Sequence, residues 1–153
     1  MSNDARKDSQ VADAPRPPSE YRSDGLLVLY EGARCIHAEE CTRGVPNVFD
    51  RKARPWIQPD RASADDIADA IQQCPSGALT FKRLTFGSDE HAEEPPRIIV
   101  IPNGPLYVRG DVEYPTQSGE RVRSLRAALC RCGGSASKPF CDNAHLENGF
   151  QAP

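Results

Sequence analysis

The distribution of apolar and polar residues divides the chain into a polar N-terminal segment, two folded regions and a connection between them. Residues 1–24 combine charge, Ser and Pro with almost no large apolar side chain. Because such a segment cannot offset the entropy lost on ordering, we predict a disordered tail. Residues 87–96 (GSDEHAEEPP) are acidic, contain two prolines and carry nothing that a core would bury, which is typical of a linker. The pattern therefore predicts one domain at residues 25–86 and another at residues 97–153.

The first domain is predicted to combine short strands with one main helix. An apolar run at residues 26–30 (LLVLY) predicts a strand, and alternation at residues 78–86 predicts another. A brief helical turn is expected at residues 38–44. The main helix is predicted to begin after Ser63, because apolar residues then recur at helical spacing until Cys74, which precedes a proline.

The second domain is predicted to consist mainly of strands. Strand patterns at residues 98–101, 105–114 and 121–130 are separated by Asn-Gly and Ser-Gly turns. A cysteine-rich loop follows, with a short helix expected from His145. The fold class predicted for the whole chain is α+β, small and β-rich, with two lobes and one main helix.

Composition narrows the functions that such a chain can have. A net charge of -3 leaves no excess of Lys and Arg to neutralise phosphates, which excludes a general nucleic-acid or membrane-surface binder. The N-terminus has no apolar segment of a secretory signal, and the longest aliphatic run, residues 98–101, is too short to cross a bilayer. We therefore expect a cytoplasmic protein. No nucleophile with its base and no phosphate-binding loop is recognisable, so we expect no enzyme.

The six cysteines supply the chemistry that the rest of the composition lacks. In a reducing compartment they favour thiolate ligands to metal over three disulfides. Two domains of this size bury little apolar surface, and 14 Pro and 11 Gly indicate extensive loops. Bound metal would therefore also stabilise the fold.

The first candidate centre lies near the C-terminus, where Cys130, Cys132, Cys141 and His145 have the spacing C-x-C-x8-C-x3-H. Three thiolates and one imidazole suit a 2Fe-2S cluster with two protein ligands on each iron, and the single imidazole should raise its reduction potential. The alternative is a zinc ion in a closed Cys3His tetrahedron. One residue between two cysteines is less usual for zinc than the C-x2-C knuckle.

At these residues the chain resembles the CDGSH iron-sulfur family, whose pattern is C-x-C-x2-[S/T]-x3-P-x-C-D-G-[S/A/T]-H. Asn143 stands where the family usually has Gly. The resemblance extends over residues 97–150 and implies a 2Fe-2S cluster held by the three cysteines and His145. The other matching positions are Ser135, Pro139, Asp142 and Ala144.

The second candidate centre consists of Cys35, Cys41 and Cys74. Their arrangement is similar to the bacterial ferredoxin run C-x2-C-x2-C followed by a remote Cys-Pro, with Ala38 in place of the middle cysteine. Three thiolates suit a 3Fe-4S cluster, or a 4Fe-4S cluster whose fourth iron takes another ligand, and the spacing does not choose between them. His37 is a further candidate, which can bind the cluster, donate a hydrogen bond to a sulfide or face solvent.

Residues 26–84 resemble the divergent mono-cluster 4Fe-4S ferredoxin domain, through CIHAEEC, VPNVFD, RPWIQPD and CPSGAL. Two clusters in one chain predict one-electron transfer to or from a redox partner protein. The alternative is that the chain stores clusters, transfers them to an acceptor protein, or senses redox state and pH through the His-ligated centre. The arginines of the second domain have two interpretations: they contact an acidic redox partner, or they are simply solvated. These residues are Arg109, Arg121, Arg123 and Arg126.

Overall fold

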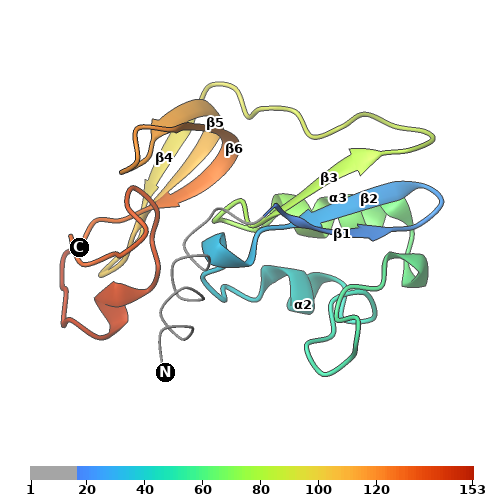
Figure 1. Cartoon of the computed structure of the whole chain (residues 1–153), viewed down its shortest axis with the longest axis horizontal. Helices are drawn as coiled ribbons and strands as arrows, with labels where there is room; N and C mark the ends of the chain where they lie inside the picture. Colours follow the sequence, from blue (N-terminus) through green and yellow to red (C-terminus); the bar gives the residue numbers. More distant parts are fainter. Residues whose placement is uncertain (1–16) are drawn as a thin grey trace, which may run out of the picture.

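The computed structural model describes residues 17–153, and in it each lobe is built on a three-stranded antiparallel sheet (Figure 1). The first sheet has the order β1-β2-β3 and the second the order β4-β5-β6. A long connection without helix or strand leads from β3 to β4. The strands are β1 Ser19–Arg22, β2 Leu26–Tyr30, β3 Leu79–Arg83, β4 Arg97–Val100, β5 Leu106–Pro115 and β6 Arg121–Leu129.

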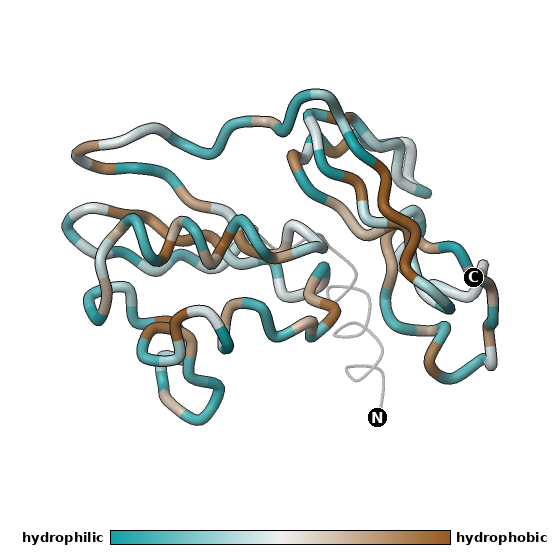
Figure 2. The backbone as a smooth tube through the Cα atoms, turned by 180° about the vertical axis from the view of Figure 1, so that it is seen from behind, coloured by the Kyte–Doolittle hydropathy of each residue, from teal (hydrophilic) through white to brown (hydrophobic). Residues whose placement is uncertain are grey.

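Helix α3 (Ala64–Gln72) is the main helix of the first lobe. Ser63 caps its N-terminus, since the Ser63 side chain accepts a hydrogen bond from Asp66 N at 3.1 Å. Ile67 and Ile71 point from one face of the helix into the core and are fully buried, and Figure 2 shows apolar and polar positions alternating along this helix. The shorter helical elements are η1 Gly32–Arg34, α2 Glu40–Gly44 and η2 Pro59–Arg61.

The second lobe is a long hairpin with a loop folded over its end. β5 and β6 pair from Leu106 with Leu129 to Pro115 with Arg121, with an irregularity between Arg109 and Val112. After β6 the chain turns back and forms the short helix η3 (Ala144–Leu146). The buried core of this lobe is small and consists of Val108, Tyr114 and Ala127.

The elements confirm the predicted fold class, a small β-rich α+β protein with one main helix. The predicted tail, in contrast, ends earlier than residue 24, because Ser19–Arg22 forms β1. This strand pairs along β2, and Tyr21 packs against the core of the first lobe. A polar sequence can form such an edge strand when a neighbouring strand supplies the hydrogen bonds. The prediction for residues 1–16 lies outside the described residues.

Buried arginines join the two lobes. Arg34 Nη2 donates to Ser76 O at 2.8 Å and to Arg126 O at 3.1 Å. Arg126 donates to Cys74 O at 2.6 Å and to Leu79 O at 2.7 Å. Gly77, with φ +72°, belongs to the same contact, since a Cβ there would collide with the carbonyl oxygen of Arg126. The strands that carry the second centre are therefore bonded directly to the first lobe.

The connection at residues 87–96 takes part in this interface. Glu90 accepts from Arg126 Nε at 2.6 Å and from Arg126 Nη2 at 2.9 Å, and only 10% of the Glu90 side chain is exposed. The expectation that this segment carries nothing to bury is therefore wrong for Glu90. Arg126 is not available to a partner protein, and Arg109 donates to Gln72 O in the first lobe.

None of the helices within residues 17–153 has the length and apolar character needed to span a bilayer.

Candidate metal centres

The four C-terminal candidates lie together as two pairs of donor atoms. Cys130 Sγ and Cys132 Sγ are 3.9 Å apart, and Cys141 Sγ lies 3.7 Å from His145 Nδ1. All the cysteines are free thiols. Within residues 17–153 no three or more His, Cys, Asp and Glu side chains converge closely enough for a single metal ion. The four candidate donors therefore lie as two close pairs.

Backbone pairing at the end of β6 brings the two pairs together. Cys130 N donates to Pro139 O at 2.8 Å, and Cys141 N donates to Ala128 O at 2.8 Å. The returning loop is therefore held as a short antiparallel partner of β6, with Leu129 opposite Phe140. This pairing places Cys141 opposite Ala128 of β6, two residues before Cys130, although ten residues separate the two cysteines in sequence.

Backbone amides point at two of the sulfurs. Gly134 N donates to Cys132 Sγ at 3.3 Å and Asn143 N donates to Cys141 Sγ at 3.4 Å. The first of these bonds lowers the pKa of the Cys132 thiol, whereas burial raises the pKa of Cys141. Bound metal deprotonates a thiol outright, and amide donors then stabilise the negative charge on sulfur.

Asp142 fixes the loop between the two pairs. Its carboxylate accepts from Ala136 N at 2.9 Å and from Ala144 N at 3.1 Å. These bonds lower the pKa of Asp142 and connect the glycine turn after Cys132 to the helical turn that carries His145. The Asp of the CDGSH pattern is thus a structural residue that orients the donors.

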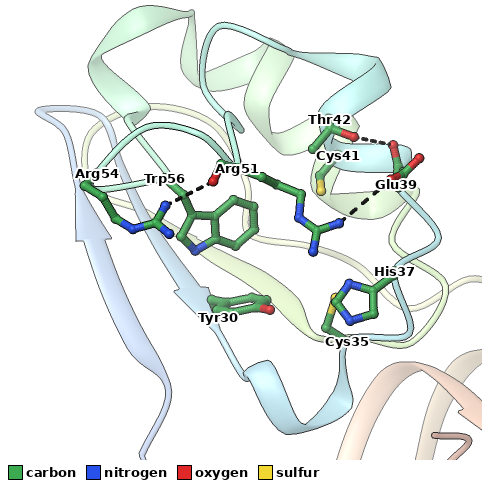
Figure 3. Close-up of a pocket in the computed structure, with 9 residues that line it drawn as sticks. All are labelled: Tyr30, Cys35, His37, Glu39, Cys41, Thr42, Arg51, Arg54 and Trp56. Carbon is green, nitrogen blue, oxygen red and sulfur yellow. Dashed lines mark hydrogen bonds and ion pairs between the residues drawn. The ribbon is translucent and has the colours of Figure 1, made fainter. Parts of the chain in front are cut away.

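Cys35, His37 and Cys41, three of the N-terminal candidates, line a cavity of about 270 Å³ (Figure 3). Cys35 follows η1, Cys41 lies in α2, and both line this cavity. Cys74 follows α3 and joins them in lining a smaller, deeper space directly beneath. Burial, reinforced by the charge of Cys74, raises the pKa of Cys41 to about 11. Three cysteines from three segments thus line one space, of about 30 Å³, and are the candidate thiolate ligands of an iron-sulfur cluster.

His37 lies at the rim of this cavity. Its side chain is exposed, and His37 Nδ1 is 3.9 Å from Cys35 Sγ. Its backbone φ of +57° turns the chain sharply between Cys35 and Cys41. Ala38, at the position of the middle ferredoxin cysteine, instead packs against the buried residues between the lobes.

Aromatic rings close one side of the cavity. Tyr30 and Trp56 meet edge to face with ring centroids 5.0 Å apart, and both line the cavity (Figure 3). Burial and the nearby Cys35 thiol raise the pKa of Tyr30. These rings give the cavity an apolar wall beside Cys35 and Cys41.

Residues 21–84 match the family described as divergent 4Fe-4S mono-cluster. Over 62 residues the chain is 36% identical to an uncharacterized protein, YjdI, of Escherichia coli strain K12, and the overlap covers 40% of this chain and 82% of the relative. The same values hold for YjdI of Escherichia coli O157:H7. The chain belongs to the divergent 4Fe-4S mono-cluster family.

A second family covers the other lobe, because residues 103–146 match the iron-binding zinc finger of CDGSH type. The mono-cluster domain therefore precedes the CDGSH domain, as the sequence resemblances indicated. Both domains are of iron-sulfur-binding types. The segment at residues 87–96 lies between the two matched regions.

The contacts that three residues near the centres make across the lobe interface were not predicted from the sequence. Arg34 and Arg126 connect the mono-cluster domain to the CDGSH domain, and the side chain of Asn143 donates to Ile36 O at 2.9 Å. The sequence does contain a signal for Asn143, since it departs from the glycine of the CDGSH pattern. For the arginines the only signal is that each lies within four residues of a cysteine.

Proposed function

We propose that the chain binds two iron-sulfur clusters and transfers single electrons to or from a redox partner protein. The C-terminal cluster is of the 2Fe-2S type on Cys130, Cys132, Cys141 and His145. The N-terminal cluster is of the 3Fe-4S or 4Fe-4S type on Cys35, Cys41 and Cys74. The observation that carries the proposal is that one small chain brings together four candidate donors near its C-terminus and three cysteines in its first lobe.

The pairing of the C-terminal donors supports a two-iron cluster over zinc. A structural zinc ion gathers four donors around one point, whereas two bridged irons take two protein ligands each. Each distance, 3.9 Å and 3.7 Å, suits two ligands of one metal, and within residues 17–153 no third His, Cys, Asp or Glu joins either pair closely enough for a single ion.

Such clusters supply reversible one-electron oxidation and reduction when they are bound. The residues of this chain hold and tune them. The amides of Gly134 and Asn143 stabilise negative charge on the cysteine sulfurs, which favours the reduced state. Tyr30 and Trp56 place apolar surface beside Cys35 and Cys41, which lowers the local polarity around a cluster bound there.

The electron-transfer proposal is tested by redox titration of the anaerobically purified protein with dithionite, followed by electron paramagnetic resonance. We expect reversible signals from both centres. His145→Cys should lower the potential of the C-terminal signal, because a second thiolate makes that iron more negative, and leave the N-terminal signal in place. Failure of both centres to be reversibly reduced would reject electron transfer.

A second candidate function is delivery of the C-terminal cluster to an acceptor protein. It is favoured by the exposure of the loop around that centre, where Gly133 and Gly134 are exposed and Leu146 is 73% exposed. Incubation with an apo-ferredoxin should then convert the acceptor to its holo form, and His145→Cys should slow the conversion because thiolate binds iron more strongly. An acceptor that gains no cluster, while the donor stays loaded, would exclude this function.

A further inference from the structure

The ligand loops of the two centres are bonded to each other across the lobe interface. Asn143 lies two residues from both Cys141 and His145, and Ile36 directly follows Cys35. Asn143 Nδ2 donates to Ile36 O at 2.9 Å. One hydrogen bond therefore connects the segment that carries two C-terminal donors to the segment that carries an N-terminal donor.

A second hydrogen bond connects the remaining ligand segments. Arg126 Nη1 donates to Cys74 O at 2.6 Å, and Arg126 lies in β6 four residues before Cys130. Arg126 is 3% exposed, so this bond is shielded from water. Both ligand segments of one centre are thus bonded to the ligand segments of the other.

Apolar packing fills the space between the same loops. Ile36, Ala128 and Cys141 form one buried cluster, and Ala38 and Tyr107 pack against it. Cys141 is 4% exposed and Ile36 is 9% exposed. A donor of the C-terminal centre is therefore packed together with the loop between Cys35 and Cys41.

The positive φ of Asn143 separates the role of its backbone in the turn from the role of its side chain in the interface. Asn143 has φ +70°, a left-handed conformation that glycine adopts at lower cost. The glycine of the CDGSH pattern would form this turn equally well. What asparagine adds is the side-chain bond to Ile36.

We propose that Asn143 couples the two centres, so that a cluster bound in the N-terminal site slows loss of the cluster from the C-terminal site, and the reverse. This inference rests on the proposed binding of two clusters. A bound cluster fixes the loop at residues 35–41, which holds the Ile36 carbonyl in place for Asn143 and thereby restrains the loop that carries Cys141 and His145. The same bond restrains both loops, so emptying either site should speed loss from the other, and the equilibrium affinities of the two sites must be coupled by equal free energies.

The test is a double-mutant cycle on the iron-loaded, full-length protein. Cys41→Ser empties the N-terminal site, and Asn143→Gly removes the bond while glycine retains the positive φ. Loss of the C-terminal cluster to excess chelator is followed by native mass spectrometry, which counts clusters by mass and requires no reduction. We expect Cys41→Ser to speed this loss by about fivefold in the otherwise native protein, as the loss of one hydrogen bond implies. In the Asn143→Gly protein, Cys41→Ser should cause no further increase in the rate of C-terminal cluster loss.

Asn103→Gly is the matched control. Asn103 also has a positive φ of 56°, but its side chain accepts from Ala152 N within the second lobe. The effect of Cys41→Ser should persist in this background. Cys35→Ser provides a second way to empty the N-terminal site if Cys41→Ser does not fold.

Two outcomes would overturn the coupling. One is that emptying the N-terminal site does not change the loss rate, and the other is that it changes the rate equally in the native and the Asn143→Gly backgrounds. Amide hydrogen exchange in residues 36–41 gives a readout that depends on neither electron transfer nor cluster counting. Asn143→Gly should increase this exchange and Asn103→Gly should not, and equal exchange in both would likewise reject the proposal. Irreducible clusters would reject electron transfer and leave this result standing.

Discussion

Ser135 supports the C-terminal donors from inside their loop. It is 4% exposed, its hydroxyl donates to Phe140 O at 2.6 Å, and it accepts from Ser137 N at 3.0 Å. Ser135→Ala leaves both backbone groups without this partner, which should lower the free energy of unfolding by about 1–3 kcal/mol. Chemical denaturation followed by circular dichroism measures the change, and faster release of iron to a chelator should accompany it.

Ser137→Ala is the control for this prediction, because only the backbone nitrogen of Ser137 takes part in the bond and its side chain is exposed. We expect a change of less than about 0.5 kcal/mol. Equal effects of the two substitutions would show that the Ser135 hydroxyl does not hold the loop.

At the residue scale, the cysteine and histidine spacing predicts the candidate donors but not what surrounds them. Cysteine and histidine at C-x-C-x8-C-x3-H carry their chemistry in the sequence, whatever the fold. The contact between Asn143 and Ile36 joins residues 107 positions apart, so no local pattern encodes it. The burial of Arg34 is likewise not encoded by any local pattern, because its partner carbonyls come from both lobes.

Helix α3 carries Cys74 to the N-terminal centre, so weakening the helix should weaken that centre. Ser63→Ala removes the capping bond to Asp66 N and should cost about 1 kcal/mol of stability. Thermal unfolding of the full chain gives the measurement, and iron retention at the N-terminal centre should fall with it. Ser63→Asp retains a good cap and should behave like the native protein. If aspartate is as damaging as alanine, the capping bond is not the cause.

Among the elements, those with strong local signals were predicted well. β2 occupies the five residues of LLVLY, and α3 begins directly after Ser63. β1 was missed because its sequence, SEYR, has no apolar alternation and becomes a strand only through its pairing with β2. Edge strands of this kind depend on tertiary context, which a local pattern does not contain.

At the scale of the whole molecule, the ion pair of Glu90 with Arg126 fastens the connecting segment to both lobes. Both side chains are nearly buried. Glu90→Gln removes the negative charge and leaves the guanidinium buried without its counter-charge, which should destabilise the protein by about 3 kcal/mol. Urea denaturation measures the loss, and limited proteolysis should cut residues 87–96 faster.

Glu93→Gln in the same segment is the matched control, since Glu93 pairs with Arg97 at a more exposed position. An exposed pair contributes at most about 1 kcal/mol. The account of the interface is wrong if both variants lose the same stability. The sequence indicated a linker here because its composition is acidic and rich in proline, and the burial of Glu90 depends on an arginine 36 positions away.

The central claim, two iron-sulfur clusters in one chain, is tested most directly by measuring iron and acid-labile sulfide per chain in anaerobically purified protein. A 2Fe-2S cluster together with a 3Fe-4S or 4Fe-4S cluster predicts about five or six irons per chain and visible absorbance. About two irons would remove the N-terminal cluster from the account. A colourless protein that contains zinc in place of iron would contradict the claim as a whole.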